Sequence, residues 1–160
     1  MSRILPIITH PDPFLRKPAK DVAPAKIRER SFQLFLDDLT RTMGSADGIG
    51  LAAIQVGSQD DVCVISMEDG PMHLVNAKIV RYGKKKATSV EGCLSVPGYS
   101  GDVHRPTEID VEAYDRFGDL ISFTASGLLA RVIQHETDHL KGILYIDRAD
   151  RIWKDDKRKK

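Results

Sequence analysis

Residues 134–142 read QHETDHLKG, and this stretch decides both the predicted fold and the predicted chemistry. His135 and His139 are four residues apart, so on a helix they lie on the same face. Two imidazoles in this register can bind one metal ion. Glu136 lies beside the first of them, where it can act as general base toward a metal-bound water. The stretch therefore predicts a hydrolytic metal site that needs a third protein ligand.

The residues around this motif favour a buried helix over a surface helix with ordinary polar side chains. The helical segment carries several large apolar residues, namely Leu128, Leu129, Val132, Ile133 and Leu140. Buried His and Glu side chains need partners, because an unpaired buried polar group costs about 1–3 kcal/mol. A metal ion supplies such a partner. Ser126 as N-cap and Gly142 as the stop residue predict a helix over 127–140.

Length and composition predict one soluble globular domain. The chain has 160 residues, of which 41% are hydrophobic and 29% are charged. A net charge of +1 disfavours a DNA-binding surface, and no apolar run approaches the length of a membrane span. The first residues, MSRILPIITHPDPFL, lack the unbroken apolar stretch of a signal peptide. We therefore expect a cytoplasmic protein without membrane or DNA partners, whose two cysteines remain reduced.

Periodicity along the chain predicts an α+β fold with mostly antiparallel sheets around the central helix that carries the metal motif. Apolar residues spaced by three and four predict a helix over 27–43. Short apolar or alternating runs predict strands at 62–65, 73–77, 78–82, 109–113, 119–125 and 143–146. The strands at 109–113 and 119–125 are expected to pair as a hairpin, and Cys63 is expected to pack in the core as a small hydrophobic residue. We expect the catalytic domain to cover residues 1–150. Residues 151–160, RIWKDDKRKK, then form a short basic tail.

Two further motifs carry candidate functional residues. In EGCLSVPGY, residues 91–99, Cys93 lies among small and turn-forming residues, which favours a thiolate ligand over a core cysteine. In GIGLAAIQVG, residues 48–57, the glycines fit neither the dinucleotide nor the P-loop spacing. They let the backbone approach a bound peptide, and Gln55 offers an amide to a developing oxyanion. The alternative for this second stretch is a plain turn that enters a strand.

Together these motifs closely resemble those of the peptide deformylase family, over about residues 5 to 147. The family's Gly-x-Gly-Leu-Ala-Ala-x-Gln, Glu-Gly-Cys-Leu-Ser and Gln-His-Glu-x-x-His runs are all intact. The resemblance implies an enzyme that removes the formyl group from the N-terminal formyl-methionine of newly made polypeptides and releases formate. It implies ferrous iron as the native metal, with zinc, nickel or cobalt as replacements. The partners would be nascent formyl-methionyl peptides.

The resemblance also implies a role for each candidate residue. The metal ligands would be Cys93, His135 and His139, and Glu136 would be the general base and acid. Gln55 and the backbone N–H of Leu94 would hold the oxyanion. The substrate-binding residues would be Ile49, Gly50, Leu128, Arg131 and Val132.

Several positions depart from common family patterns. Arg131 stands where many bacterial members have an apolar pocket residue, and we expect its stem to pack while its charge reaches solvent. Ser100 replaces a frequent arginine, and Ile54 a frequent proline. Arg105 is expected to pair with Glu91 inside the fold. These departures concern the shape of the side-chain pocket, which the sequence leaves open.

Two rival classes remain weaker. A His-Glu-x-x-His peptidase takes its third ligand from a later His or Glu, yet the 21 residues after His139 contain neither. A closed structural zinc site needs a fourth Cys or His. Cys63, His10, His73 and His104 are available, but none has a paired spacing. The basic tail is either a solvated end or a segment that holds the enzyme near ribosomal RNA.

Overall fold

The computed structural model describes residues 1–156 and has the predicted α+β architecture. Within these residues, strands form two antiparallel sheets, one in the order β1-β2-β3-β6-β7 and one in the order β4-β5-β8. The strands are β1 Gly50–Ala52, β2 Val62–Met67, β3 Gly70–Tyr82, β4 Lys86–Cys93, β5 Val96–Pro106, β6 Glu108–Tyr114, β7 Leu120–Ser126 and β8 Arg151–Lys154. No helix in the described part is long and apolar enough to cross a membrane.

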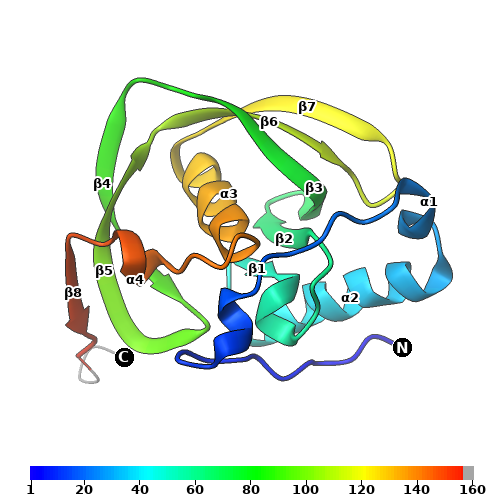
Figure 1. The fold of residues 1–160 in the computed structure, drawn as a ribbon, viewed down its shortest axis with the longest axis horizontal. Coiled ribbons are helices and arrows are strands. Elements are labelled where there is room, and N and C mark those ends of the chain that lie inside the picture. The colour runs from blue at the N-terminus through cyan, green and yellow to red at the C-terminus, as the bar shows by residue number, and fades with distance from the viewer. Residues whose placement is uncertain (157–160) are drawn as a thin grey trace.

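The helix that carries the metal motif, α3 Gly127–His139, lies between the two sheets (Figure 1). It packs against β1, β2, β6 and β7 of the first sheet and against β5 of the second. Its apolar side chains join the main core cluster, to which it contributes Ala130, Val132 and Ile133. The remaining helical segments are η1 Pro13–Arg16, α1 Pro24–Ile27, α2 Arg30–Ser45, η2 Ala53–Val56 and α4 Tyr145–Arg148. Most residues of α3 are buried, in agreement with its central position in the fold.

Both ends of α3 lie where the sequence predicts them. Ser126 occupies the N-cap position, although its side chain makes no capping hydrogen bond. Gly142 has φ +77°, and a Cβ there would lie 2.5 Å from the carbonyl oxygen of Arg16. Glycine is therefore required at the point where the chain leaves the helix.

The alternating segments also form the predicted strands. In β6, Ile109, Val111 and Ala113 are buried while the residues between them are more exposed. The pairing of β6 with β7 confirms the predicted hairpin. The two strands predicted at 73–77 and 78–82 are one strand, β3, with an irregular register between Val75 and Lys78. Asn76 lies there at φ 53°, a conformation that asparagine tolerates better than most residues.

The N-terminal helical region differs from the prediction, since it begins at Pro24 and is interrupted at residues 28–29. The segment expected over 27–43 is divided into the short helix α1 and the longer α2. Ile27 and Phe32, on either side of this break, are both buried in the same core cluster. The break therefore lets both apolar residues face the core.

The prediction of a last strand at 143–146 was wrong. Tyr145 begins the short helix α4, and the Asp147 carboxylate accepts a hydrogen bond from the backbone N–H of Leu144. Tyr145 is buried among the residues of a third core cluster. A short apolar run fits a buried helical turn as well as a strand, so periodicity could not separate the two.

The C-terminal part of the chain adds a strand that the sequence analysis did not anticipate. Residues 151–154 form β8, which pairs with β5 through Tyr99–Lys154 and Asp102–Arg151. Residues 157–160 of the predicted basic tail lie outside the described residues. The tail therefore starts as part of the smaller sheet.

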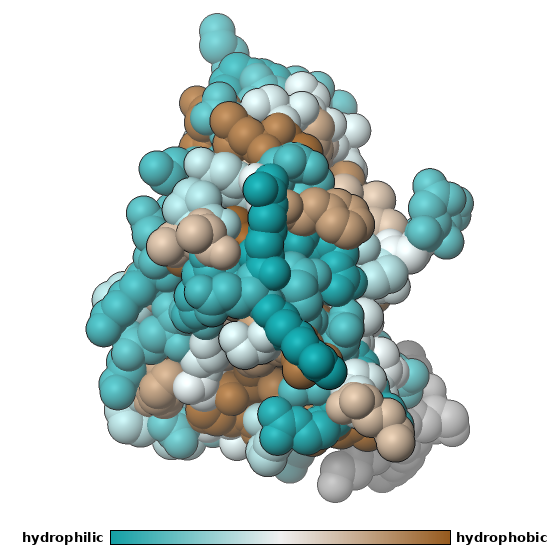
Figure 2. Space-filling model, turned by 90° about the vertical axis from the view of Figure 1, so that its right-hand side faces the viewer, coloured by the Kyte–Doolittle hydropathy of each residue, from teal (hydrophilic) through white to brown (hydrophobic). Residues whose placement is uncertain are grey.

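The surface seen from the side of α1 and the start of α2 is mainly hydrophilic. Figure 2 shows hydrophobic residues there in separate patches between hydrophilic side chains.

Cys63 is fully buried in β2 and forms no disulfide. The prediction that Cys63 is a core residue is confirmed.

Candidate metal centre and substrate pocket

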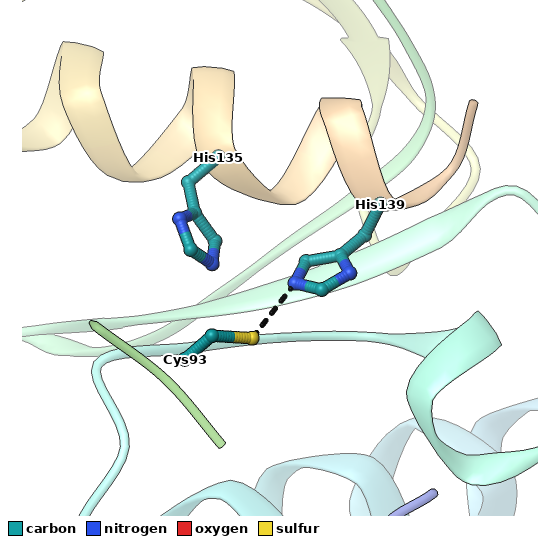
Figure 3. Close-up of side chains that lie close together, drawn as sticks. All are labelled: Cys93, His135 and His139. Carbon is teal, nitrogen blue, oxygen red and sulfur yellow. Dashed lines mark hydrogen bonds between the residues drawn. The ribbon is translucent and has the colours of Figure 1, made fainter. Parts of the chain in front are cut away.

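Cys93, His135 and His139 come together at one point of the fold. Cys93 ends β4, and the two histidines occupy successive turns of α3. Their ligand atoms all lie within 4.8 Å of one another, and Sγ of Cys93 is 3.2 Å from Nε2 of His139. Figure 3 shows both imidazole rings projecting from α3 toward the Cys93 side chain. The structure thus brings the three predicted ligands together.

The donor set and its surroundings fit one divalent ion. One thiolate and two imidazoles suit zinc or iron, and three ligands leave a position for a reacting molecule. His139 is 1% exposed, and burial lowers its pKa well below the ordinary value, so the ring is neutral. Among the described residues, Oε2 of Glu136 is one of the buried side-chain atoms without a hydrogen-bond partner. Solvent bound to an ion at this site would satisfy it.

Glu91 supports His135 from the side away from Cys93. Oε1 of Glu91 lies 2.8 Å from Nδ1 of His135, which leaves Nε2 for a metal. Arg105 donates two hydrogen bonds to the same carboxylate, at 2.6 and 2.9 Å. Burial alone would raise the pKa of Glu91, but the hydrogen bonds from His135 and Arg105 lower it to about 2. Glu91 is therefore ionised, and its predicted pairing with Arg105 is confirmed.

Arg131 does not reach solvent as predicted. Its guanidinium turns inward and donates to Oε2 of Glu91 at 2.7 Å and to the carbonyl oxygens of Val103 and Ala87 at 2.9 Å each. The Arg131 side chain is only 13% exposed. The buried negative charge of Glu91 attracts the guanidinium more strongly than solvent does, because the low dielectric strengthens the pair.

Asp138 is a supporting residue that the sequence analysis missed. Its carboxylate accepts hydrogen bonds from Arg105 at 2.9 Å and from Arg148 at 2.7 and 3.0 Å. Asp138 precedes a predicted ligand, but no sequence spacing connects it with arginines that are distant along the chain. Together these contacts form a continuous network from His135 through Glu91 and Arg105 to α4.

Glu136 lies next to the metal centre in a confined space. It is 3% exposed, and burial raises its pKa to about 7. β1 passes directly over it, since a Cβ added to Gly50 would lie 2.5 Å from Oε1 of Glu136. The glycine allows this close approach of backbone to carboxylate.

Gln55 is held in one orientation. Its Oε1 accepts a hydrogen bond from the backbone N–H of Ala52 at 2.9 Å. Its Nε2 donates to Oγ of Ser95 at 3.0 Å and lies 3.7 Å from Sγ of Cys93. The amide nitrogen therefore faces the metal centre, where a donor to an oxyanion would be needed.

A pocket of about 450 Å³ opens beside these residues. Its walls include almost all predicted site residues: Ile49, Gly50, Gln55, Cys93, Leu94, Leu128, Arg131, Val132, His135 and Glu136. His139 is not among the residues that line the pocket, and its Nε2 lies 3.2 Å from Sγ of Cys93. The walls also include Ser100, which was expected to affect the shape of the pocket, and residues that the sequence analysis did not assign to the site, among them Val90, Tyr99 and Asp155. This volume is in the range of sites that bind drug-sized ligands.

The histidines considered for a closed zinc site have other neighbours. Nδ1 of His104 lies 3.0 Å from the hydroxyl of Thr88, and Nε2 of His73 lies 2.8 Å from that of Thr40. In the described part of the chain, the grouping of metal-binding side chains contains only three members. The geometry therefore favours an open site over a closed structural one.

Comparison with known proteins agrees with this geometry. The polypeptide deformylase family model matches residues 4–155. A peptide deformylase of Caldicellulosiruptor bescii is 48% identical over 91% of this chain and 85% of its own length. One of Xylella fastidiosa is 45% identical over 98% of this chain and 94% of its own length.

Solved structures of similar proteins show the same fold. The peptide deformylase of Synechococcus elongatus in complex with actinonin has a TM-score of 0.88 and 43% identity, over 92% of this chain and 79% of that one. The peptide deformylase of Thermotoga maritima has a TM-score of 0.89 and 34% identity, over 93% and 99%. With these matches and the metal-binding geometry, the chain belongs to the peptide deformylase family.

Proposed function

We propose that this chain removes the formyl group from the N-terminal formyl-methionine of newly synthesised polypeptides and releases formate, with Cys93, His135 and His139 holding one divalent ion. Deformylation is the activity of the family. The observation that carries the proposal is the convergence of these three side chains beside the buried Glu136, on the wall of a pocket.

Ferrous iron is the proposed native ion, and zinc, nickel or cobalt can take its place because all accept nitrogen and sulfur ligands. When bound, the ion supplies Lewis-acid chemistry, which polarises the substrate carbonyl and lowers the pKa of water. Glu91 supports this site through His135, since its carboxylate orients the ring.

Glu136 is the proposed general base and acid. Burial raises the pKa of Glu136, which strengthens the carboxylate as a proton acceptor. The carboxylate accepts a proton from the attacking water and later returns it to the amine that leaves. Its confinement under Gly50 fixes the carboxylate relative to the reacting carbon.

Gln55 and the backbone N–H of Leu94 are the proposed oxyanion donors, since both residues line the pocket beside Cys93. Removal of one such donor costs about 10²–10³ in rate in other acyl-transfer sites. We propose that Ile49 and Gly50 align the substrate backbone. Leu128, Val132 and the stem of Arg131 would contact the methionine side chain.

The variant Glu136→Gln tests the proposal. The amide has nearly the same shape but cannot accept the proton, so we expect normal metal content and folding with deformylation abolished. Formate release from formyl-Met-Ala-Ser is measured anaerobically, with metal analysis on the same sample. Glu112→Gln is the matched control, because Glu112 is an exposed glutamate on β6. More than a few per cent of activity in Glu136→Gln would exclude Glu136 as the base.

We also propose that the protein acts in the cytoplasm and that its last basic residues bring it near the ribosome, where its substrate emerges. Lys154 belongs to β8, so the deletion that tests this should remove only residues 157–160. The deletion should weaken ribosome co-sedimentation at low salt and leave hydrolysis of a free formyl tripeptide unchanged. Equal co-sedimentation of both proteins would show that residues 157–160 do not contribute to ribosome binding.

A further inference from the structure

A strap near the N-terminus bonds to both motifs that carry the proposed oxyanion donors. Residues 7–10 form this strap, and the chain before it runs past α2 (Figure 1). The backbone N–H of Ile8 donates to the backbone carbonyl of Gln55, in the glycine-rich motif, at 2.7 Å. The backbone N–H of His10 donates to the carbonyl of Ser95, in the motif of the cysteine ligand, also at 2.7 Å. The strap therefore bridges two segments that are 40 residues apart in the sequence.

The strap limits the separation of these two segments. Ile8 and His10 are two residues apart, and two residues of chain span at most about 7 Å. Pro6 and Pro11 lie on either side of the strap, and each proline restricts the backbone to a narrow range of φ. The two accepting carbonyls are therefore held close together by a piece of chain with little conformational freedom.

Gln55 is held at both its backbone and its side chain. The strap binds its backbone carbonyl, and its Nε2 donates to Oγ of Ser95 at 3.0 Å. Gln55 is 1% exposed and Ser95 is fully buried, so water does not compete for these hydrogen bonds. The backbone N–H of Ser95 also donates to Sγ of Cys93, at 3.4 Å. Leu94 lies between these two residues, so the backbone is fixed on each side of it.

Apolar packing keeps the strap against the two motifs. Ile7 packs against a core cluster that Leu94 also contacts. Ile8 packs against a second cluster, which Cys93 also contacts. Both isoleucines of the strap are half-buried, whereas Ile4, earlier in the chain, is 58% exposed. The strap is therefore anchored in the core beside the site.

We propose that the strap positions the two oxyanion donors, the Gln55 amide and the Leu94 N–H, relative to each other. Its positioning residues are Ile8 and His10, which do not line the pocket and act through their backbone N–H groups. The inference rests on the proposed deformylase function and adds residues that act on its oxyanion donors. Because the oxyanion develops only in the transition state, a misplaced donor lowers kcat and leaves KM nearly unchanged.

The test uses three substitutions at Ile8 in the full-length, metal-loaded enzyme. Alanine, glycine and proline all remove the side chain, but only Ile8→Pro removes the N–H that binds Gln55. Relative to Ile8→Ala, kcat for formyl-Met-Ala-Ser should fall by about 10- to 100-fold in Ile8→Pro, since a misplacement of about 1 Å can cost 10²-fold. Ile8→Gly keeps the N–H but loosens the strap, so its kcat should fall by about two- to fivefold. KM should stay within about twofold in both variants.

Ile4→Pro is the matched control. Within the described residues the N–H of Ile4 makes no hydrogen bond, and its side chain is exposed, so the variant should keep the wild-type kcat. Circular dichroism and metal analysis on every variant separate a loss of folding or of metal from a loss of positioning.

An equal kcat in Ile8→Pro and Ile8→Ala would overturn the inference, as would a fall in activity that metal loss or KM alone accounts for. If Ile8→Pro does not fold, Ile8→Gly and Ile8→Ala are compared instead, and an equal kcat in these two would also overturn it. No activity of the wild-type enzyme on any formyl peptide would instead contradict the proposed function.

Discussion

The close approach of β1 to Glu136 makes Gly50→Ala a sensitive test of the site. A Cβ at Gly50 would lie 2.5 Å from Oε1 and 3.0 Å from Cδ of Glu136, and 2.9 Å from Cγ1 of Val132. Gly50 has no positive φ, so alanine suits its backbone. The variant therefore perturbs the site through contact alone.

The size of the effect follows from these distances. Non-bonded carbon atoms settle at about 3.5–4.0 Å, so the Glu136 carboxylate must move by about 1 Å. A misplacement of about 1 Å can cost about 10²-fold in rate. This corresponds to about 3 kcal/mol of lost transition-state stabilisation. We therefore expect kcat for formyl-Met-Ala-Ser to fall by about two orders of magnitude.

Formate release and metal content should be measured on the same protein. The three atoms nearest to the added methyl belong to Glu136 and Val132, not to a metal ligand, so metal content should stay normal. Gly44→Ala is the matched control, because a Cβ there meets nothing within 4 Å and alanine favours helix α2. Wild-type activity in Gly50→Ala would refute the reasoning that the position of Glu136 limits the rate.

Further expectations concern other side chains. Cys93→Ser should weaken metal binding, whereas Cys63→Ser should lower stability only; equal metal loss would contradict the assignment of Cys93 as a ligand. Burial lowers the pKa of His73 from 6.5 to about 4, so as the pH falls His73 binds a proton in the unfolded chain before it does so in the folded protein. The contribution of the neutral, buried His73 to the free energy of unfolding is about 3 kcal/mol; it is complete above pH 6.5 and is lost as the pH falls toward 4. Urea unfolding between pH 6.5 and 4 should show that the wild type loses more stability than His73→Gln as the pH falls. Parallel pH profiles of the two proteins would disprove this role of His73. Arg131→Met removes a charged hydrogen bond to Glu91 and should lower the free energy of unfolding by about 1–3 kcal/mol. An unchanged urea midpoint would show that Arg105 alone is enough to stabilise the buried Glu91 carboxylate.

The local pattern of the sequence was sufficient for the parts of the fold that depend on nearby residues. The spacing of His135 and His139 within an apolar segment predicted α3, and Gly142 predicted its end. Alternation at Ile109 and Val111 predicted the hairpin of β6 and β7. These elements follow from periods of 3.6 and 2 residues, which side-chain burial imposes on each element separately.

Only the tertiary structure decided the features that depend on distant partners. Ile143–Ile146 did not form a strand, because Tyr145 is buried in a helical turn. Arg131 turned inward because Glu91, 40 residues away, offers a buried charge. β8 formed because β5 was available for pairing, and this pairing carried Asp155 to the pocket. A polar, basic segment has no period that predicts a strand, so its place follows from hydrogen bonds to a strand far away in the sequence.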